Sequence, residues 1–181
     1  MVWLFSGRMK MQEKTNALQE EIERYRRIIK AGFDYKLTKL IDNGMPEHAA
    51  VLYEQFFVNA EDIVRIFCKN LSKQVFEFPF VVDAARRAIK KGVTIDILLQ
   101  DENPERSCFS LLLQDYGIKP LHITEEELRI TPANFSVMDR RAFRYEKDRE
   151  HFTAKACAYD PEIASRFADR FDSIKAVTRG C

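Results

Sequence analysis

Two short runs of branched aliphatic residues, with an amphipathic helical pattern between them, constrain the fold most strongly. Residues 62–69 contain Ile-Val-Arg-Ile-Phe-Cys, and residues 93–99 contain a second compact run, Val-Thr-Ile-Asp-Ile-Leu-Leu. Both runs are typical of buried strands. The helical pattern over 79–91 ends at Gly92, a residue that favours helix termini. Strands joined by a helix lie parallel in one sheet, so this stretch predicts an α/β fold.

The alternation of helices and strands extends to both sides of this unit. A helix is predicted at 46–60, and a helix over about 105–115 and a short strand near 119–123 follow the second run. The last third predicts strands at 134–138, 142–146 and 152–159, and a closing helix from Asp160 onward. The first two of these strands form a hairpin through residues 139–141. Together these elements predict a mixed β-sheet flanked by helices.

The first third of the chain has a different pattern. Residues 8–42 are predicted to be mainly helical, with Gly32 ending or kinking the helix and a second short helix at Tyr35–Ile41. Near-apolar residues recur at alternating spacings of four and three, namely Met11, Thr15, Leu18, Ile22, Tyr25 and Ile29. Such a heptad seam packs either against its own domain or against a second copy of the chain, and both alternatives stay open.

A run of helix-breaking residues, Asn43-Gly44-Met45-Pro46, closes this segment. We therefore expect two parts: an N-terminal helical, coiled-coil-like segment over 1–45 and an α/β domain over 46–181.

Composition excludes several classes of protein. Among the 181 residues, 29 Lys and Arg balance 28 Asp and Glu, which argues against a dedicated polycationic nucleic-acid binder. A charged fraction of 31% argues against a membrane protein, and the apolar Trp3-Leu4-Phe5 is too short to span a bilayer. The four cysteines, Cys68, Cys108, Cys157 and Cys181, lack the spacing of a zinc or redox motif. We expect free thiols, a cytoplasmic location, and neither metal nor cofactor.

Motifs for nucleotide binding, the hydrolase nucleophile elbow and zinc proteases are missing, and His48, His122 and His151 are isolated in the sequence. The most charged run is 139–150, which contains two aromatic residues. Its Arg140 and Arg144 either contact phosphates or, because carboxylates are interspersed, form a salt-bridged hairpin.

Residues 49–176 resemble a single unit of the phospholipase D superfamily. The resemblance rests on residues 56–66 as a helix running into the first strand, 80–98 as the next helix and strand, 134–144 as the motif strand and turn, and 167–174 as the final helix. It implies an α/β sandwich of the phospholipase D type.

The motif that carries catalysis in that family is altered in this sequence. Active members have H-x-K-x4-D, in which the histidine is the nucleophile and the lysine neutralises the phosphoryl oxygens. Aligning the aspartate on Asp139 puts Pro132 in place of the histidine and Asn134 in place of the lysine. The Gly-Ser pair that follows the motif is replaced by Glu146-Lys147. The resemblance therefore implies a degenerate, non-catalytic site.

Three functional hypotheses follow. The first is a non-catalytic binding or assembly module: family members face two motif strands across a pseudo-dyad, so a one-unit chain would do so as a homodimer. Its cleft would bind a phosphate-bearing ligand or nucleic acid through Asn134, Ser136, Asp139, Arg141 and Arg144. The second is a phosphodiesterase or nuclease with a rearranged site that uses His122 or His151. The third is a structural or regulatory subunit of a larger complex.

Overall fold

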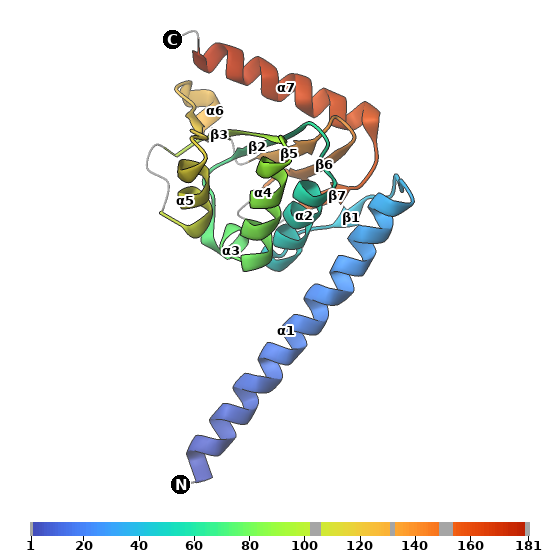
Figure 1. Cartoon of the computed structure of the whole chain (residues 1–181), viewed down its shortest axis with the longest axis vertical. Coiled ribbons are helices and arrows are strands. Elements are labelled where there is room, and N and C mark those ends of the chain that lie inside the picture. The colour runs from blue at the N-terminus through green and yellow to red at the C-terminus, as the bar shows by residue number, and fades with distance from the viewer. Residues whose placement is uncertain (1, 102–105, 131–132, 149–153, 180–181) are drawn as a thin grey trace.

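The sheet at the centre of the molecule is mixed, as the sequence predicts. The computed structural model describes residues 2–101, 106–130, 133–148 and 154–179, with side chains from residue 15 onward. Within these residues the sheet has seven strands in the order β1-β7-β6-β5-β2-β3-β4 (Figure 1). Strands β2 (Ile63–Cys68), β3 (Thr94–Leu99) and β4 (Leu121–His122) are parallel, and β5 (Asn134–Met138), β6 (Ala142–Glu146), β7 (Ala154–Cys157) and β1 (Ile41–Asp42) extend the sheet in antiparallel fashion.

Helices cover both faces of this sheet, which confirms the predicted α/β class. The chain forms α1 (Val2–Asp34), α2 (Pro46–Asn59), α3 (Lys73–Phe76), α4 (Pro79–Lys90), α5 (Cys108–Asp115), α6 (Glu126–Ile130) and α7 (Pro161–Arg179). Helix α7 lies on one face, and α1, α2, α4 and α5 contribute to the core on the other. Gly92 has a φ of 91° directly after α4, in the left-handed conformation expected at a helix end.

Alternation along the central strands produces the two core layers. In β2, Val64 and Ile66 are fully buried in the core shared with α2 and α4, whereas Phe67 belongs to the core under α7. Strand β5 alternates in the same way, because Phe135 and Val137 pack beneath α7 and Met138 belongs to the opposite core.

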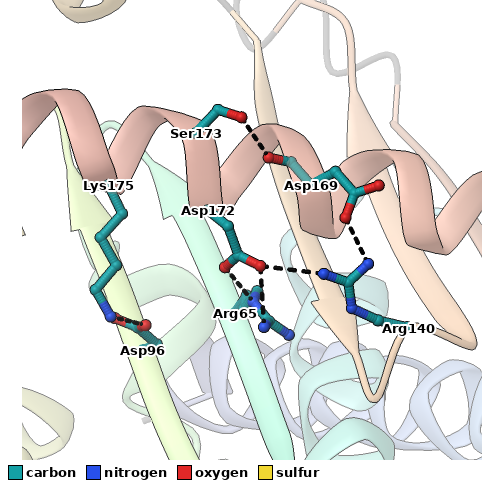
Figure 2. Close-up of polar contacts among 7 residues, drawn as sticks. All are labelled: Arg65, Asp96, Arg140, Asp169, Asp172, Ser173 and Lys175. Carbon is teal, nitrogen blue, oxygen red and sulfur yellow. Dashed lines mark hydrogen bonds and ion pairs between the residues drawn. The ribbon is translucent and has the colours of Figure 1, made fainter.

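Ion pairs supplement the apolar contacts that attach α7 to the sheet (Figure 2). Asp172 accepts hydrogen bonds from Arg65 Nε at 3.0 Å and from an Arg140 amino group at 3.2 Å. Arg140 also pairs with Asp169 at 2.6 Å, and Lys175 pairs with Asp96 of β3. Arg140 is thus ion-paired, but its described partners lie on α7 and not among the carboxylates of its own run, so these salt bridges join the hairpin turn to the helix.

Helix α1 differs from the prediction near its end. The helix runs without interruption through Gly32 to Asp34, and residues 35–40 form a turn and irregular backbone where a second short helix was predicted. Two features explain the difference. Lys36 has a φ of 51°, which no right-handed helix contains, and Ile41 and Asp42 are drawn into the sheet by pairing with β7.

Only the second half of α1 packs against the rest of the protein. Ile22, Tyr25 and Ile29 are 1–3% exposed and belong to the core that α2 and α4 share. Residues 15–20 are all exposed, and the N-terminal half of the helix projects away from the other elements (Figure 1). The seam therefore packs intramolecularly from Ile22 onward, whereas its described positions before Ile22 are exposed.

Gly32 sets how closely α1 approaches the loop after β7. A Cβ built on Gly32 would lie 2.9 Å from the Cβ of Ala158, which is 3% exposed and has no room to move. We expect Gly32→Ala to lower the free energy of unfolding by about 1–2 kcal/mol, because overpacking outweighs the gain of about 1 kcal/mol in helix propensity. Urea denaturation measures this change.

The control is the same substitution in an Ala158→Gly background, where the facing methyl group is gone. Gly32→Ala should cost less there than in the wild type. An equal cost in both backgrounds would show that the close approach of the two residues does not limit packing.

Candidate functional site

A pocket opens at the C-terminal end of β2, next to the start of β5 and the end of β6. Its volume is about 180 Å³, and its lining residues are Gly44, Met45, Pro46, Ala49, Tyr53, Cys68, Lys69, Asn70, Ser72, Gln74, Val75, Phe76, Asn134, Arg144 and Glu146. In open α/β sheets, ligands bind beyond the carboxyl ends of parallel strands. We call this pocket the cleft, and two of the predicted site residues, Asn134 and Arg144, line it.

An ion pair forms the floor of the cleft. Arg144 and Glu146 lie two residues apart on β6, so both side chains point to the same face of the sheet. Their side chains are 8% and 9% exposed, and two nitrogen–oxygen contacts of 3.2 and 3.3 Å join them. Asn134, opposite Glu146 on β5, donates its amide to Glu146 Oε2 at 2.7 Å and accepts from the backbone N–H of Lys69 at 3.1 Å.

The hydrogen-bond network continues from Arg144 into α1. Arg144 Nε donates to Asn43 Oδ1 at 2.7 Å, Asn43 donates its amide to Tyr25 Oη at 2.8 Å, and Tyr25 donates to the carbonyl of Asp42 at 2.9 Å. Asn43 is fully buried, and burial raises the pKa of Tyr25 to about 12. The floor of the cleft is thus connected to the helix that projects from the domain.

Ser136 lies one layer below the cleft. It is 1% exposed, and its hydroxyl hydrogen-bonds that of Tyr53 at 2.7 Å. Burial raises the pKa of Tyr53 to about 12. Ser136 therefore shares a face with Asn134 and Arg144, but it contacts Tyr53 and is not among the residues that line the cleft.

Asp139 and Arg141 lie at the other end of the β5–β6 hairpin. Asp139 and Arg140 have φ values of 47° and 53°, the pair of left-handed residues that a two-residue hairpin turn requires. The Asp139 carboxylate accepts the backbone N–H groups of residues 61, 62 and 63 at 2.8–3.0 Å. Arg141 donates to the carbonyl of Asn59 at 2.6 Å. Both side chains hold the connection between α2 and β2.

Neither of the described histidines, His48 and His122, is among the residues that line the cleft. His48 stacks on Tyr25 with ring centroids 3.8 Å apart, and its Nε2 lies 3.0 Å from Glu21. His122 hydrogen-bonds the carbonyl of Asp101 at 2.8 Å. The second candidate nucleophile, His151, and Pro132, at the motif's histidine position, lie outside the described residues.

Sequence reasoning missed three residues of this site. Lys69 is an exposed lysine at the rim of the cleft, and Glu146 forms the ion pair with Arg144. Asn43 belongs to the run of helix-breaking residues that predicts only a boundary between two parts of the chain. One signal was available: Lys69 is the last residue of the predicted strand segment 62–69, at the sheet edge where ligands bind. The pairing of Glu146 with Arg144 depends on the register of β5 and β6, which no sequence pattern specified.

Chemically, the cleft offers hydrogen-bonding groups and, at its rim, Lys69, which makes no ion pair with the other described residues. Among the described residues, no cluster of three or more histidine, cysteine or acidic side chains could hold a metal ion. No helix in the same part of the chain is both long and apolar enough to cross a membrane.

Comparison with known proteins finds similar folds among solved structures but no similar sequence among family models or curated proteins. No protein-family model matches the chain, and no curated protein sequence does. Among solved structures, Nuc from Salmonella typhimurium, a phospholipase D family member, superposes with a TM-score of 0.52 at 16% identity, over 70% of this chain and 86% of Nuc.

A second solved structure covers more of this chain. TrmBL2, an archaeal chromatin protein with a novel mode of DNA binding, superposes with a TM-score of 0.59 at 12% identity, over 94% of this chain and 64% of TrmBL2. At such identities the likeness concerns the fold, and the chain has the phospholipase D-like fold that the resemblance implied.

Asp139 provides a test that separates a structural role from a role in binding. Asp139→Ala removes the acceptor for three backbone N–H groups and places alanine at a positive φ. We expect it to lower the free energy of unfolding by about 2–3 kcal/mol. Asp139→Asn keeps one carbonyl oxygen and tolerates this φ, so it should lose about 1 kcal/mol. If both variants unfold like the wild type in thermal and urea denaturation, the structural role is refuted.

Proposed function

We propose that the chain is a non-catalytic, phospholipase D-like binding module that acts as a homodimer and binds nucleic acid through its phosphates at the cleft. The observation that carries the proposal is the state of the cleft floor. Arg144, Glu146 and Asn134 are hydrogen-bonded to one another, so their polar groups are already occupied. The nucleophile of active phospholipase D-type sites is a histidine, and no histidine is among the described residues that line the cleft.

The rim of the cleft supports the phosphate part of the proposal. Lys69 is exposed, and Ser72, just before α3, and Gln74, on α3, carry groups that donate hydrogen bonds. Phosphate contacts of this kind position nucleic acid without reading its sequence. A volume of about 180 Å³ is small, so the phosphodiester would lie across the rim with its bases outside.

Removing the charge of Lys69 tests the binding site. We expect Lys69→Gln to weaken binding of a fluorescent 20-nucleotide single strand severalfold at low salt, because one phosphate contact is lost. The slope of log affinity against log salt should fall by about 1. Fluorescence anisotropy over a salt series, with duplex DNA and RNA in parallel, measures both quantities.

Lys90→Gln is the matched control, since it removes the same charge from an exposed position on α4. It should bind like the wild type. Equal losses in the two variants would point to non-specific attraction, and no binding by the wild type would favour a structural subunit of a larger complex.

The same samples address the alternative of a phosphodiesterase with a rearranged site. Metal-independent cleavage of the labelled strands, abolished by His122→Ala or His151→Ala, would overturn the non-catalytic part of the proposal. Binding without cleavage supports it.

The homodimer part of the proposal is supported by the N-terminal half of α1, whose described residues 15–20 are exposed. An isolated helix of this length is marginally stable in water, so its exposed seam calls for a partner. Leu18 is 40% exposed at a seam position, and the heptad spacing of Met11, Thr15 and Leu18 suits a second copy of the same helix.

Leu18→Asp should therefore convert the dimer to a monomer in light scattering after gel filtration. The melting temperature of the domain itself should not change, because Leu18 is exposed and belongs to neither core of the described residues. Gln19→Asp introduces the same charge at the neighbouring position, outside the seam, and should remain dimeric. A Leu18→Asp variant with the mass of a dimer would exclude this seam as the interface.

A further inference from the structure

A second cavity lies beside α5 and the edge strand β4, apart from the cleft. Its volume is about 340 Å³, within the range of cavities that bind small organic ligands. Its walls include Leu71, Leu113, Ile118 and Pro120, and Lys119 and His122 also line it. One of the three functional hypotheses uses His122 for catalysis, but none assigns an apolar ligand to this cavity.

The walls of the cavity favour an apolar occupant. Leu71 and Leu113 are 2% and 1% exposed, and Ile118 is partly buried and packs against the same core. Protein interiors are normally filled to crystal-like density, so apolar side chains around an open space of this size leave dispersion contacts unmade. A hydrocarbon chain of a few carbons would supply them.

The polar residues favour a negative charge on that occupant. The described lining residues include Lys119 and His122 but no aspartate or glutamate. Lys119 is exposed and makes no ion pair within the described chain.

His122 is held in one orientation. Its Nδ1 lies 2.8 Å from the carbonyl oxygen of Asp101, and because a carbonyl only accepts, Nδ1 carries the proton. The other ring nitrogen, Nε2, remains for a ligand.

We infer that this cavity binds a small amphipathic anion, namely a short aliphatic chain with a carboxylate or phosphate headgroup. Lys119 Nζ and the His122 ring would hold the headgroup, and the chain would lie among Leu71, Leu113 and Ile118. The inference does not rest on the function proposed for the cleft.

Four six-carbon probes test the inference with the full-length protein: hexanoate, hexyl phosphate, hexanol and hexylamine. Backbone amide shifts of Leu113 and Gly117 report binding by NMR titration. We expect at least one of the two anions to bind, hexanol to bind at least tenfold more weakly, and hexylamine not to bind. Preference for hexanoate or for hexyl phosphate identifies the headgroup. Binding of hexylamine as tight as that of the anions, or of no probe at all, would overturn the inference.

Chain length tests the apolar half of the cavity. Affinity should rise about fourfold for each methylene from butanoate to hexanoate, which is the factor that burial of one CH₂ group gives. No dependence on chain length would show that only the charges attract the anion, and would overturn the inference.

Substitutions test the headgroup contacts. Asparagine in His122→Asn keeps a donor for the Asp101 carbonyl but removes Nε2, so the fold should survive while anion binding weakens about tenfold. Lys119→Gln should weaken it similarly, and Lys91→Gln, on the exposed end of α4, should have no effect. Anion binding that persists unchanged in both His122→Asn and Lys119→Gln would overturn the inference.

Discussion

A positive and a negative charge side by side in the interior, Arg144 and Glu146, organise the structure around the cleft. Each is less than a tenth exposed, so neither tolerates the loss of its partner, and removing one member of such a pair costs about 3–5 kcal/mol. The remaining donors and acceptors of the pair are satisfied by Asn134 and Asn43, which lie 91 positions apart in the chain. Through Asn134 the pair stabilises the register of the hairpin. Through Asn43 it holds the chain before α2 and, by way of Tyr25, the position of α1 on the domain.

The two ends of the β5–β6 hairpin have different tasks. At one end, alternate residues of β5 and β6 face the cleft, and the residue that the resemblance aligns with the motif lysine, Asn134, is engaged with Glu146 and the backbone of Lys69. At the other end, the Asp139 carboxylate accepts hydrogen bonds from three backbone N–H groups of the α2–β2 connection. An aspartate with this structural task is retained whether or not chemistry takes place at the distant end, so its presence in a motif is weak evidence for catalysis.

Most of the fold was predictable because it follows from local pattern. The runs at 62–69 and 93–99, the helix ending at Gly92 and the hairpin at 139–141 all appear as expected, since burial and turn chemistry are written in neighbouring residues. The course of residues 35–41 was not predictable, because pairing with β7 decides it. The cleft was predicted in part: Asn134 and Arg144 line it, but Glu146, Asn43 and Lys69 join them only through strand register and the return of a distant segment.

Helix α1 gives the molecule a mechanical property that neither core explains. It is one continuous helix, so its free half and its packed half turn together as a lever. Tyr25 lies in the packed half of the helix and accepts a hydrogen bond from Asn43, and Asn43 in turn accepts one from Arg144. The projecting arm and the charged floor of the cleft are therefore joined by one unbroken path of covalent bonds and hydrogen bonds.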